Sequence, residues 1–349
     1  MKKGLVLEGG GVKGSYQIGS FYAFKDCGIK LDGFVGTSIG SFNACMLASN
    51  MYKELLDFWN NVNPGDLLDF DKSFVKSINT KEVDKKAVIG ALSTLKQVVE
   101  NKGVDNNKLM SEIYDLVDYN KLIKSNKDFG LVTVRLSGLK PLYVYKENIK
   151  SKEKLIEYLM ASCYFPGFKE KKLIDNHYYI DGGFYDNSPV KLLKDKDYEK
   201  VYIINIKGIG INRTYPSNID IVEIKSSRDT GLIFELDQNV IRDNIKMGYY
   251  DTLRVLKKLD GYKYCFKRRS EQYYEFITRK VEKRLLRRTM GFFDTKSFKE
   301  TVIKSLEYYC EHEKVDYYKV YNSYHLIKKV RKSKNKKFIY QFLREIKFL

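Results

Sequence analysis

Short apolar runs alternate with helical spacings over roughly the first 225 residues, as in proteins built from strands and helices. Seven runs predict strands, at residues 4–8, 34–35, 131–136, 142–145, 178–180, 201–206 and 219–224. Helices are expected around Ile18, Phe21 and Tyr22, from Ile39 onward to about residue 125, and over residues 151–161. This alternation predicts an α/β fold with a mainly parallel sheet.

The pattern changes towards the C-terminal end of the chain. Residues 251–349 show no strand-like alternation and contain no proline. Residues 268–290 and residues 336–349 each repeat apolar side chains at helical spacing and are each predicted to form one amphipathic helix. The repeating side chains are Tyr274, Ile277, Val281 and Leu285 in the first stretch, and Phe338, Phe342, Ile346 and Leu349 in the second. We therefore expect two parts, a domain of residues 1–230 and a mostly helical region of residues 231–349.

Composition and charge narrow the class of protein. Hydrophobic residues make up 43% of the 349 residues, which suffices for a core and excludes a mainly disordered chain. Residues 251–349 hold 27 Lys and Arg against 12 Asp and Glu, a net +15 of the +19 carried by the whole chain. This excess suits an anionic partner such as a membrane surface, or a nucleic acid.

Cysteines and the N-terminal sequence indicate a compartment. The five cysteines are widely spaced, odd in number and without a CxxC pair, which argues against a disulfide framework or a zinc site and favours a reducing compartment. The apolar run that begins at Leu5 is cut short by Glu8, so we expect no secretory signal. We expect a cytoplasmic protein, with peripheral contact with the inner face of the membrane left open.

The first glycine-rich motif is Gly9-Gly10-Gly11-Val12-Lys13-Gly14, between a predicted strand and a helix. Glycines allow the backbone N–H groups to approach a ligand closely, and the helix N-terminus favours an anion. Alone, the motif fits a dinucleotide-binding loop, an oxyanion loop or a purely structural turn.

The second motif is Gly36-Thr37-Ser38-Ile39-Gly40, again between a strand and a helix. G-x-S-x-G in this context is typical of a nucleophilic serine on a strained turn, with glycines where the turn crowds side chains. The simpler reading is that Ser38 only caps the helix.

The third motif is Asp181-Gly182-Gly183, directly after a predicted strand. An aspartate at a strand's carboxyl end is placed where α/β proteins hold ligands. As an isolated motif it is more simply an Asp-Gly turn.

Together and in this order, the motifs resemble those of the patatin-like phospholipases. Two further stretches agree, Ala161-Ser162-Cys163-Tyr164-Phe165-Pro166-Gly167-Phe168 and the continuation of the third motif to Val190. The resemblance implies a three-layer α/β/α fold, followed here by a basic helical extension. It implies a lipid acyl hydrolase (phospholipase A or carboxylesterase type) with an acyl-enzyme intermediate on Ser38, Asp181 as partner, and no metal or other cofactor.

The resemblance also assigns the remaining motif residues. Gly9, Gly10, Gly11 and Gly14 would form the oxyanion hole, and Lys13, Gly36, Gly40, Gly182 and Gly183 would support the motifs. Lys13 would bind phosphate or would hold the loop to a carboxylate. The substrate would be a lipid or another acyl ester.

Alternatives remain from the sequence alone. A histidine-dependent α/β-hydrolase would use Ser38, Asp181 and His312 in its chain order. A dinucleotide-binding protein would need an acidic residue at the end of the second strand, whereas Asp32 precedes that strand. A catalytically latent protein would use the basic C-terminal region to bind a membrane or, less readily, a nucleic acid, for which no recognition motif is present.

Overall fold

The computed structural model of the chain describes residues 1–63, 107–165, 168, 171–235 and 237–348. Contacts divide the chain into two compact units, Met1–Tyr249 and Tyr250–Leu349. The division falls inside helix α11 (Gln238–Leu256), later than the expected boundary after residue 230. The first part of α11 packs on α1 (Ser15–Asp26), where the Ser20 hydroxyl donates to the Gly248 carbonyl at 3.3 Å.

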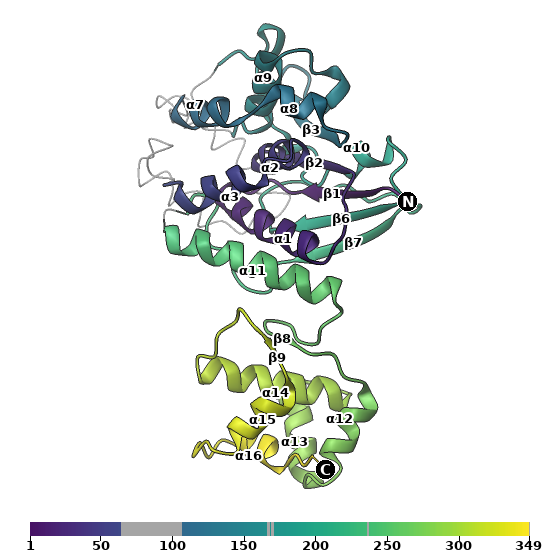
Figure 1. Cartoon of the computed structure of the whole chain (residues 1–349), viewed down its shortest axis with the longest axis vertical. Coiled ribbons are helices and arrows are strands. Elements are labelled where there is room, and N and C mark those ends of the chain that lie inside the picture. The colour runs from purple at the N-terminus through teal and green to yellow at the C-terminus, as the bar shows by residue number, and fades with distance from the viewer. Residues whose placement is uncertain (64–106, 166–167, 169–170, 236, 349) are drawn as a thin grey trace. The chain divides into compact units, whose positions relative to one another are not determined.

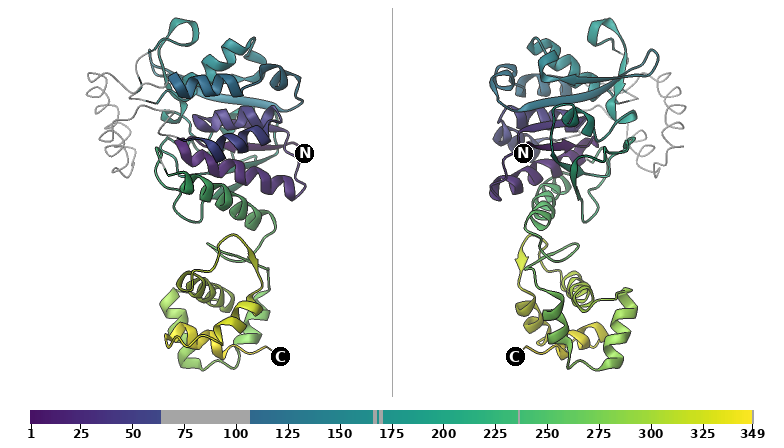
Figure 2. Two further views of the ribbon diagram at one scale, coloured as in Figure 1. Left: turned by 60° about the vertical axis from the view of Figure 1, so that its left-hand side comes forward. Right: turned by 90° about the vertical axis from the view of Figure 1, so that its right-hand side faces the viewer.

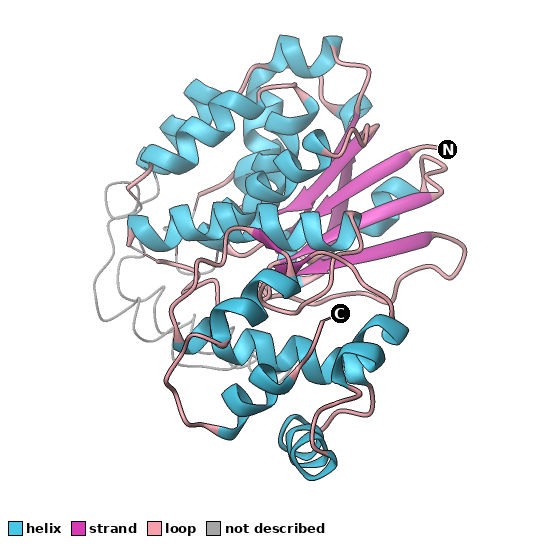
Figure 3. Ribbon diagram, turned by 60° about the horizontal axis from the view of Figure 1, so that its bottom comes forward, coloured by secondary structure: helices cyan, strands magenta, loops and turns pink. Residues whose placement is uncertain are grey.

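The first unit is built around one sheet, drawn in Figure 1 and in magenta in Figure 3. The described residues contribute seven strands to it, with β4-β3-β2-β1-β6-β7 in order and β5 paired to β3. The strands are β1 (Lys3–Leu7), β2 (Gly33–Thr37), β3 (Asp128–Arg135), β4 (Lys140–Tyr145), β5 (Tyr179–Asp181), β6 (Lys200–Asn205) and β7 (Asp220–Lys225). Strands β3, β2, β1, β6 and β7 run parallel, and β4 and β5 pair antiparallel to β3. The predicted α/β fold with a mainly parallel sheet is confirmed.

Alternate side chains of the strands serve two helical layers, because successive residues of a strand face opposite sides. On one face, Phe34 and Tyr202 contact the α1 rings of Phe21 and Phe24. On the other face, Val6, Val35 and Val201 form a core cluster with α10 (Val190–Lys194). A sheet buried on both faces explains why the strands were visible as continuous apolar runs.

Further helices of this unit pack on the sheet or on one another. They are α2 (Ile39–Ala48), α3 (Tyr52–Asn61), α7 (Asn107–Leu116), α8 (Tyr119–Lys124) and α9 (Lys152–Ser162). The expected helix over residues 151–161 therefore corresponds to α9. Part of the helical stretch expected up to residue 125 lies at residues 64–106, outside the described residues.

The second unit is mainly helical, as Figure 2 shows, with helices packed on a common core. Its helices are α12 (Glu271–Thr278), α13 (Lys283–Phe293), α14 (Phe298–His312), α15 (Ser323–Val330) and α16 (Phe338–Glu345). The sequence did not indicate the short parallel pair β8 (Cys265–Phe266) and β9 (Val320–Tyr321).

The prediction of one helix over residues 268–290 is wrong, because α12 and α13 are separate. At the break, the Ile277 carbonyl accepts the Lys347 N–H and the Glu282 N–H donates to the Glu345 carboxylate, each at 3.1 Å. The segment around α16 thus satisfies backbone groups that the helix leaves free. The same contacts end α16 at Glu345, short of the predicted 349.

Candidate active site

Ser38 occupies a strained turn between β2 and α2. Its φ of 56° and ψ of −133° lie outside the regions that non-glycine residues normally adopt. A Cβ at Gly36 would lie 2.2 Å from the Gly40 carbonyl oxygen, and one at Gly40 would lie 2.1 Å from the Leu7 carbonyl oxygen. The glycines of G-x-S-x-G are therefore needed because the turn, the start of α2 and β1 pass so close together.

Hydrogen bonds from two serines hold this turn. The Ser38 N–H donates to the Ser162 hydroxyl at 2.9 Å, and that hydroxyl donates to the Val132 carbonyl at 2.7 Å. The Ser41 hydroxyl donates to the Ser38 carbonyl at 2.6 Å. The sequence analysis quoted Ser162 within a motif but gave it no role.

Asp181 reaches Ser38 from an antiparallel strand. It pairs with Thr133 of β3, one position beyond Val132, which pairs with Thr37 of β2. Asp181 therefore lies level with Ser38. Its carboxyl accepts the Gly183 N–H at 2.8 Å, and the nearby Ser38 side chain acts to lower its pKa.

Burial dominates the electrostatics of Asp181, which is only 4% exposed. Loss of water raises the pKa of the Asp181 carboxyl to about 6, and the hydrogen bonds from Ser38 and the Gly183 N–H oppose that rise. No histidine stands between Ser38 and Asp181 among the residues that the structure describes.

The glycine-rich loop after β1 offers backbone N–H groups. Gly11 has a φ of 57°, and a Cβ there would lie 2.2 Å from the Ile233 carbonyl oxygen. The Gly9 N–H donates to Asn187 Oδ1 at 3.0 Å and the Val12 N–H to the Ile233 carbonyl at 2.9 Å. Within the described part of the chain, the N–H groups of Gly10 and Gly11 donate to no other group.

The other predicted loop residues have different surroundings. A Cβ at Gly14 would lie 3.1 Å from the Ile39 side chain, and the Gly14 carbonyl accepts Asn43 Nδ2 at 3.0 Å. Burial lowers the pKa of the Lys13 ammonium, while nearby Asp229 opposes that shift. Gly14 thus packs the loop against α2, and Lys13 has a carboxylate in its electrostatic surroundings.

The second and third motifs meet around Gly182 and Gly183. A Cβ at Gly182 would lie 2.1 Å from the Val132 carbonyl oxygen, and one at Gly183 would lie 3.1 Å from Asn187 Oδ1. The Thr37 hydroxyl donates to the Asp186 carbonyl at 2.8 Å. The close approach of the β3 backbone accounts for Gly182, and the Asn187 side chain leaves little room for a Cβ at Gly183.

Glu8, at the carboxyl end of β1, is a buried carboxyl group that the sequence analysis missed. Its side chain accepts the Ser188 hydroxyl at 2.7 Å, the Ile206 N–H at 3.1 Å and Asn212 Nδ2 at 3.3 Å. Burial nevertheless raises the pKa of the Glu8 carboxyl to about 7. Glu8 thereby ties the base of the glycine-rich loop to two other loops. A carboxyl residue directly before three glycines was the available signal.

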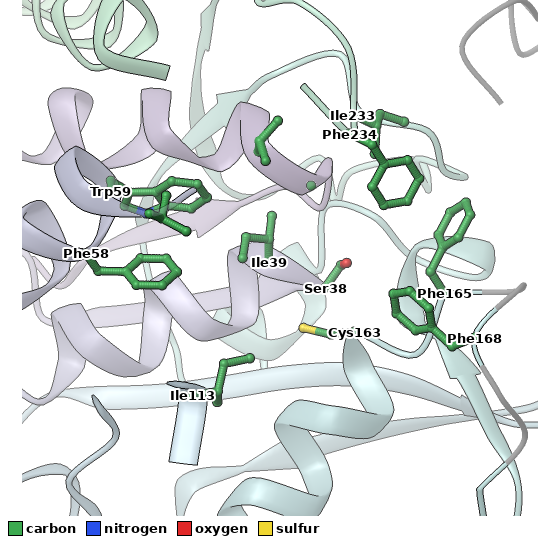
Figure 4. Close-up of a pocket in the computed structure, with 13 residues that line it drawn as sticks. Ser38, Ile39, Phe58, Trp59, Ile113, Cys163, Phe165, Phe168, Ile233 and Phe234 are labelled. Carbon is green, nitrogen blue, oxygen red and sulfur yellow. The ribbon is translucent and has the colours of Figure 1, made fainter. Parts of the chain in front are cut away.

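An apolar pocket opens beside Ser38 (Figure 4). The rings of Phe165, Phe168 and Phe234 lie to one side of Ser38 and those of Phe58 and Trp59 to the other. The remaining lining residues are Gly11, Val12, Ile39, Val62, Ile113, Cys163 and Ile233. Such a pocket suits a hydrocarbon chain with its reactive end at the serine hydroxyl.

Cys163 brings a thiol next to Ser38. Burial raises the pKa of this thiol, although the Ser41 and Ser38 side chains oppose the rise. The thiol therefore stays protonated near neutral pH and is a poor nucleophile. Pro166 and Gly167 of the same predicted motif lie outside the described residues.

Two features of the described residues concern metals and membranes. No group of three or more His, Cys, Asp or Glu side chains is arranged there to hold a metal ion. No described helix combines the length and apolar character needed to cross a membrane.

The fold and this geometry define a three-layer α/β protein with a serine and a buried aspartate together at the end of its sheet. Residues 5–194 match the family of patatin-like phospholipases, and the chain belongs to that family. No curated protein matches the chain.

The solved structures similar to this chain include the following two. VipD from Legionella pneumophila is 14% identical, with 98% of this chain and 83% of that chain covered and a TM-score of 0.44. The type III effector protein ExoU is 12% identical, with 74% and 53% covered and a TM-score of 0.38.

Proposed function

We propose that this protein is a lipid acyl hydrolase, of the phospholipase A or carboxylesterase type, in which Ser38 is the nucleophile and Asp181 is its base. One observation carries the proposal: the strand pairing brings Ser38 level with the buried Asp181 beside an apolar pocket that Ser38 lines. This closeness favours a Ser-Asp pair over the histidine-dependent alternative, in which an imidazole would separate the two.

In the first step, the Ser38 oxygen attacks the ester carbonyl carbon while the Asp181 carboxylate takes the serine proton. Aspartate in water is a weak base, with a pKa of about 3.9. Burial raises the pKa of Asp181 to about 6, which makes this carboxylate a stronger base near neutral pH. The strained backbone of Ser38 holds the hydroxyl out of the helix that follows.

The attack creates a negatively charged oxygen that needs hydrogen-bond donors. The N–H groups of Gly10 and Gly11 suit this role because no described group accepts them. The N-terminus of α2, which begins at Ile39, adds its partial positive charge. Since the Gly9 N–H is occupied by Asn187 and Gly14 packs on α2, we assign these two glycines to holding the loop. One such donor is worth about 2.7–4 kcal/mol in the transition state.

The intermediate then breaks down. The bond from the carbonyl carbon to the alcohol oxygen breaks, the alcohol leaves with the proton held by Asp181, and the acyl group remains on Ser38. A water molecule next attacks the acyl-enzyme while Asp181 takes one of its protons. The fatty acid leaves, and the proton returns to the Ser38 oxygen.

The shape of the pocket indicates the acyl part of the substrate. Its walls are phenyl, indole and aliphatic groups, so binding a hydrocarbon chain there is favoured by roughly 0.8 kcal/mol of free energy for each CH₂ that leaves water. We therefore expect long acyl esters to be better substrates than acetate. A lipid substrate also places the working enzyme at a membrane surface, which we propose to be the cytoplasmic one because the five cysteines are free.

The test is hydrolysis of p-nitrophenyl esters, from acetate to palmitate, by the wild type and by Ser38→Ala and Asp181→Asn. Both variants should lose at least about a thousandfold in kcat, as removal of a nucleophile or its base does in other serine enzymes. Ser49→Ala is the matched control, because it removes a buried hydroxyl at the other end of α2. Turnover by Ser38→Ala at the wild-type rate would overturn the proposal.

A further inference from the structure

Four neighbouring cations on one helix of the second unit have no acidic partner. Lys283, Arg284, Arg287 and Arg288 of α13 are all exposed, and no ion pair joins them to any described residue. Arg284, Arg288 and Phe292 follow one another at intervals of four residues and so form one stripe along the helix. Leu285 and Thr289, next to this stripe, are the buried residues of the helix.

The acidic side chains of the packed helices have other partners. Glu311 of α14 pairs with Lys263, the Glu313 carboxylate accepts the Tyr340 hydroxyl, and Glu345 of α16 accepts the Glu282 N–H. These three carboxylates therefore do not neutralise the positive charge of α13.

Aromatic rings continue the stripe on to α14 and α16. Phe292 is 56% exposed, and its ring packs edge-to-face on Phe338 at 5.4 Å and on Tyr308 at 6.2 Å between centroids. The Arg288 guanidinium lies over the Phe338 ring at 4.2 Å, and the Lys337 ammonium lies over the Tyr308 ring at 5.6 Å. An exposed phenyl group thus stands among cations.

We propose that this basic-aromatic face, made of Lys283, Arg284, Arg287, Arg288, Phe292 and Lys337, docks the protein on an anionic phospholipid bilayer. Cations next to a bilayer attract its acidic headgroups, and an exposed phenyl group can enter the interface between headgroups and acyl chains. The choice of a bilayer as partner rests on the proposed function, since a lipid ester is presented to the enzyme at such a surface.

The arrangement of the rings distinguishes a bilayer from a nucleic acid. Proteins that bind single strands stack bases on open aromatic faces. Here Arg288 covers a face of Phe338, Lys337 lies over Tyr308, and the ring contacts of Phe292 are edge-to-face. The faces of Phe338 and Tyr308 are thus covered by cations and not open to bases, and the exposed Phe292 lies beside positive charge, which suits a headgroup layer.

The experiment is co-sedimentation of the full chain with phosphatidylcholine vesicles, with and without phosphatidylserine. The test variant combines Lys283→Ala, Arg284→Ala and Arg287→Ala, three side chains for which the described structure gives no tertiary contact. The matched control combines Lys257→Ala, Lys267→Ala and Lys319→Ala, which removes three exposed cations from outside α13 in the same unit. At roughly fivefold for each cation near the surface, the test variant should bind phosphatidylserine vesicles about a hundredfold more weakly than the wild type.

The control variant should keep most of its vesicle binding. Phe292→Ser should bind vesicles more weakly than Phe276→Ser. Phe276 is the matched control for Phe292 because its phenyl group is 42% exposed and also lies beside an arginine, Arg279. Equal binding by the test and control variants would overturn the proposal, as would a wild type that ignores phosphatidylserine. A third result would also overturn the proposal: the test variant loses binding to a single-stranded oligonucleotide but binds vesicles as well as the wild type does. Hydrolysis of a water-soluble ester by all variants reports separately on the proposed catalytic site.

Discussion

The backbone N–H of Ser38 donates to the hydroxyl of Ser162 at 2.9 Å, across 124 residues of sequence. Ser162 ends α9 and, through its own bond to the Val132 carbonyl, ties the nucleophile turn to strand β3. The N–H of the proposed nucleophile is thereby used to hold the turn, which is why we propose that the glycine-rich loop and the start of α2 stabilise the reaction's negative charge.

Ser162→Ala should lower activity although Ser162 does not line the pocket. The change leaves the N–H of Ser38 without its acceptor, and a buried unpaired group costs about 1–3 kcal/mol. We expect kcat to fall roughly tenfold to a hundredfold while KM changes little, because the turn loses its alignment. Ser49→Ala, which removes another fully hydrogen-bonded hydroxyl, is the control. If both variants lose activity equally, Ser162 has no special part in positioning.

The pH dependence of kcat/KM should follow Asp181. Burial raises the pKa of this carboxyl to about 6, and only the ionised form can accept the Ser38 proton. Activity on an uncharged ester should therefore rise as the pH rises through about 6 and level off above it. Measurement in a series of buffers at constant ionic strength checks this. A rate that stays constant down to about pH 4 would show that this carboxyl is not the base.

Glu8 should make the fold less stable as the pH rises. Its folded-state pKa is raised from 4.5 to about 7, so its stabilising contribution is complete below about pH 4.5 and is lost as the pH passes 7. The loss amounts to roughly 3 kcal/mol. In Glu8→Gln, which cannot titrate, the difference in unfolding free energy between acidic and mildly alkaline buffer should shrink by about this amount. Urea unfolding at several pH values measures it, and an unchanged difference would refute the assignment.

Gly11→Ala should inactivate the enzyme for steric reasons. The new Cβ would lie 2.2 Å from the Ile233 carbonyl oxygen, and the loop would have to move away from Ser38. Gly28→Ala is the matched control, since Gly28 also has a positive φ (67°) but has no neighbour within 4 Å of a new Cβ. The control should lose only about 1 kcal/mol of stability, because alanine is strained at this positive φ, and it should keep full activity. Equal activity in the two variants would mean that the loop is not part of the site.

Much of the sheet could be predicted because its strands are local apolar runs. The strands that carry the motifs, β1, β2 and β5, begin or end within one or two residues of the predicted ranges. The three glycine-bearing motifs meet at the proposed site. These features depend on short stretches of chain, which periodicity and turn residues encode directly.

Contacts between distant segments could not be predicted in the same way. The bond from the Ser38 N–H to Ser162 depends on how α9 packs against β3 and α2, and the burial of Glu8 depends on loops some 180 to 200 residues further on. The break between α12 and α13 follows from hydrogen bonds with Glu345 and Lys347. Such tertiary contacts override the helical spacing that the sequence shows.

The most direct test of the account is to trap the acyl-enzyme. The protein is mixed with a long-chain p-nitrophenyl ester, quenched in acid during turnover, and digested for peptide mass analysis. The account predicts one acyl group on the peptide that contains Ser38, absent from Ser38→Ala and greatly reduced in Asp181→Asn. An acyl group on Cys163, or steady turnover with unmodified Ser38 under these conditions, would contradict it.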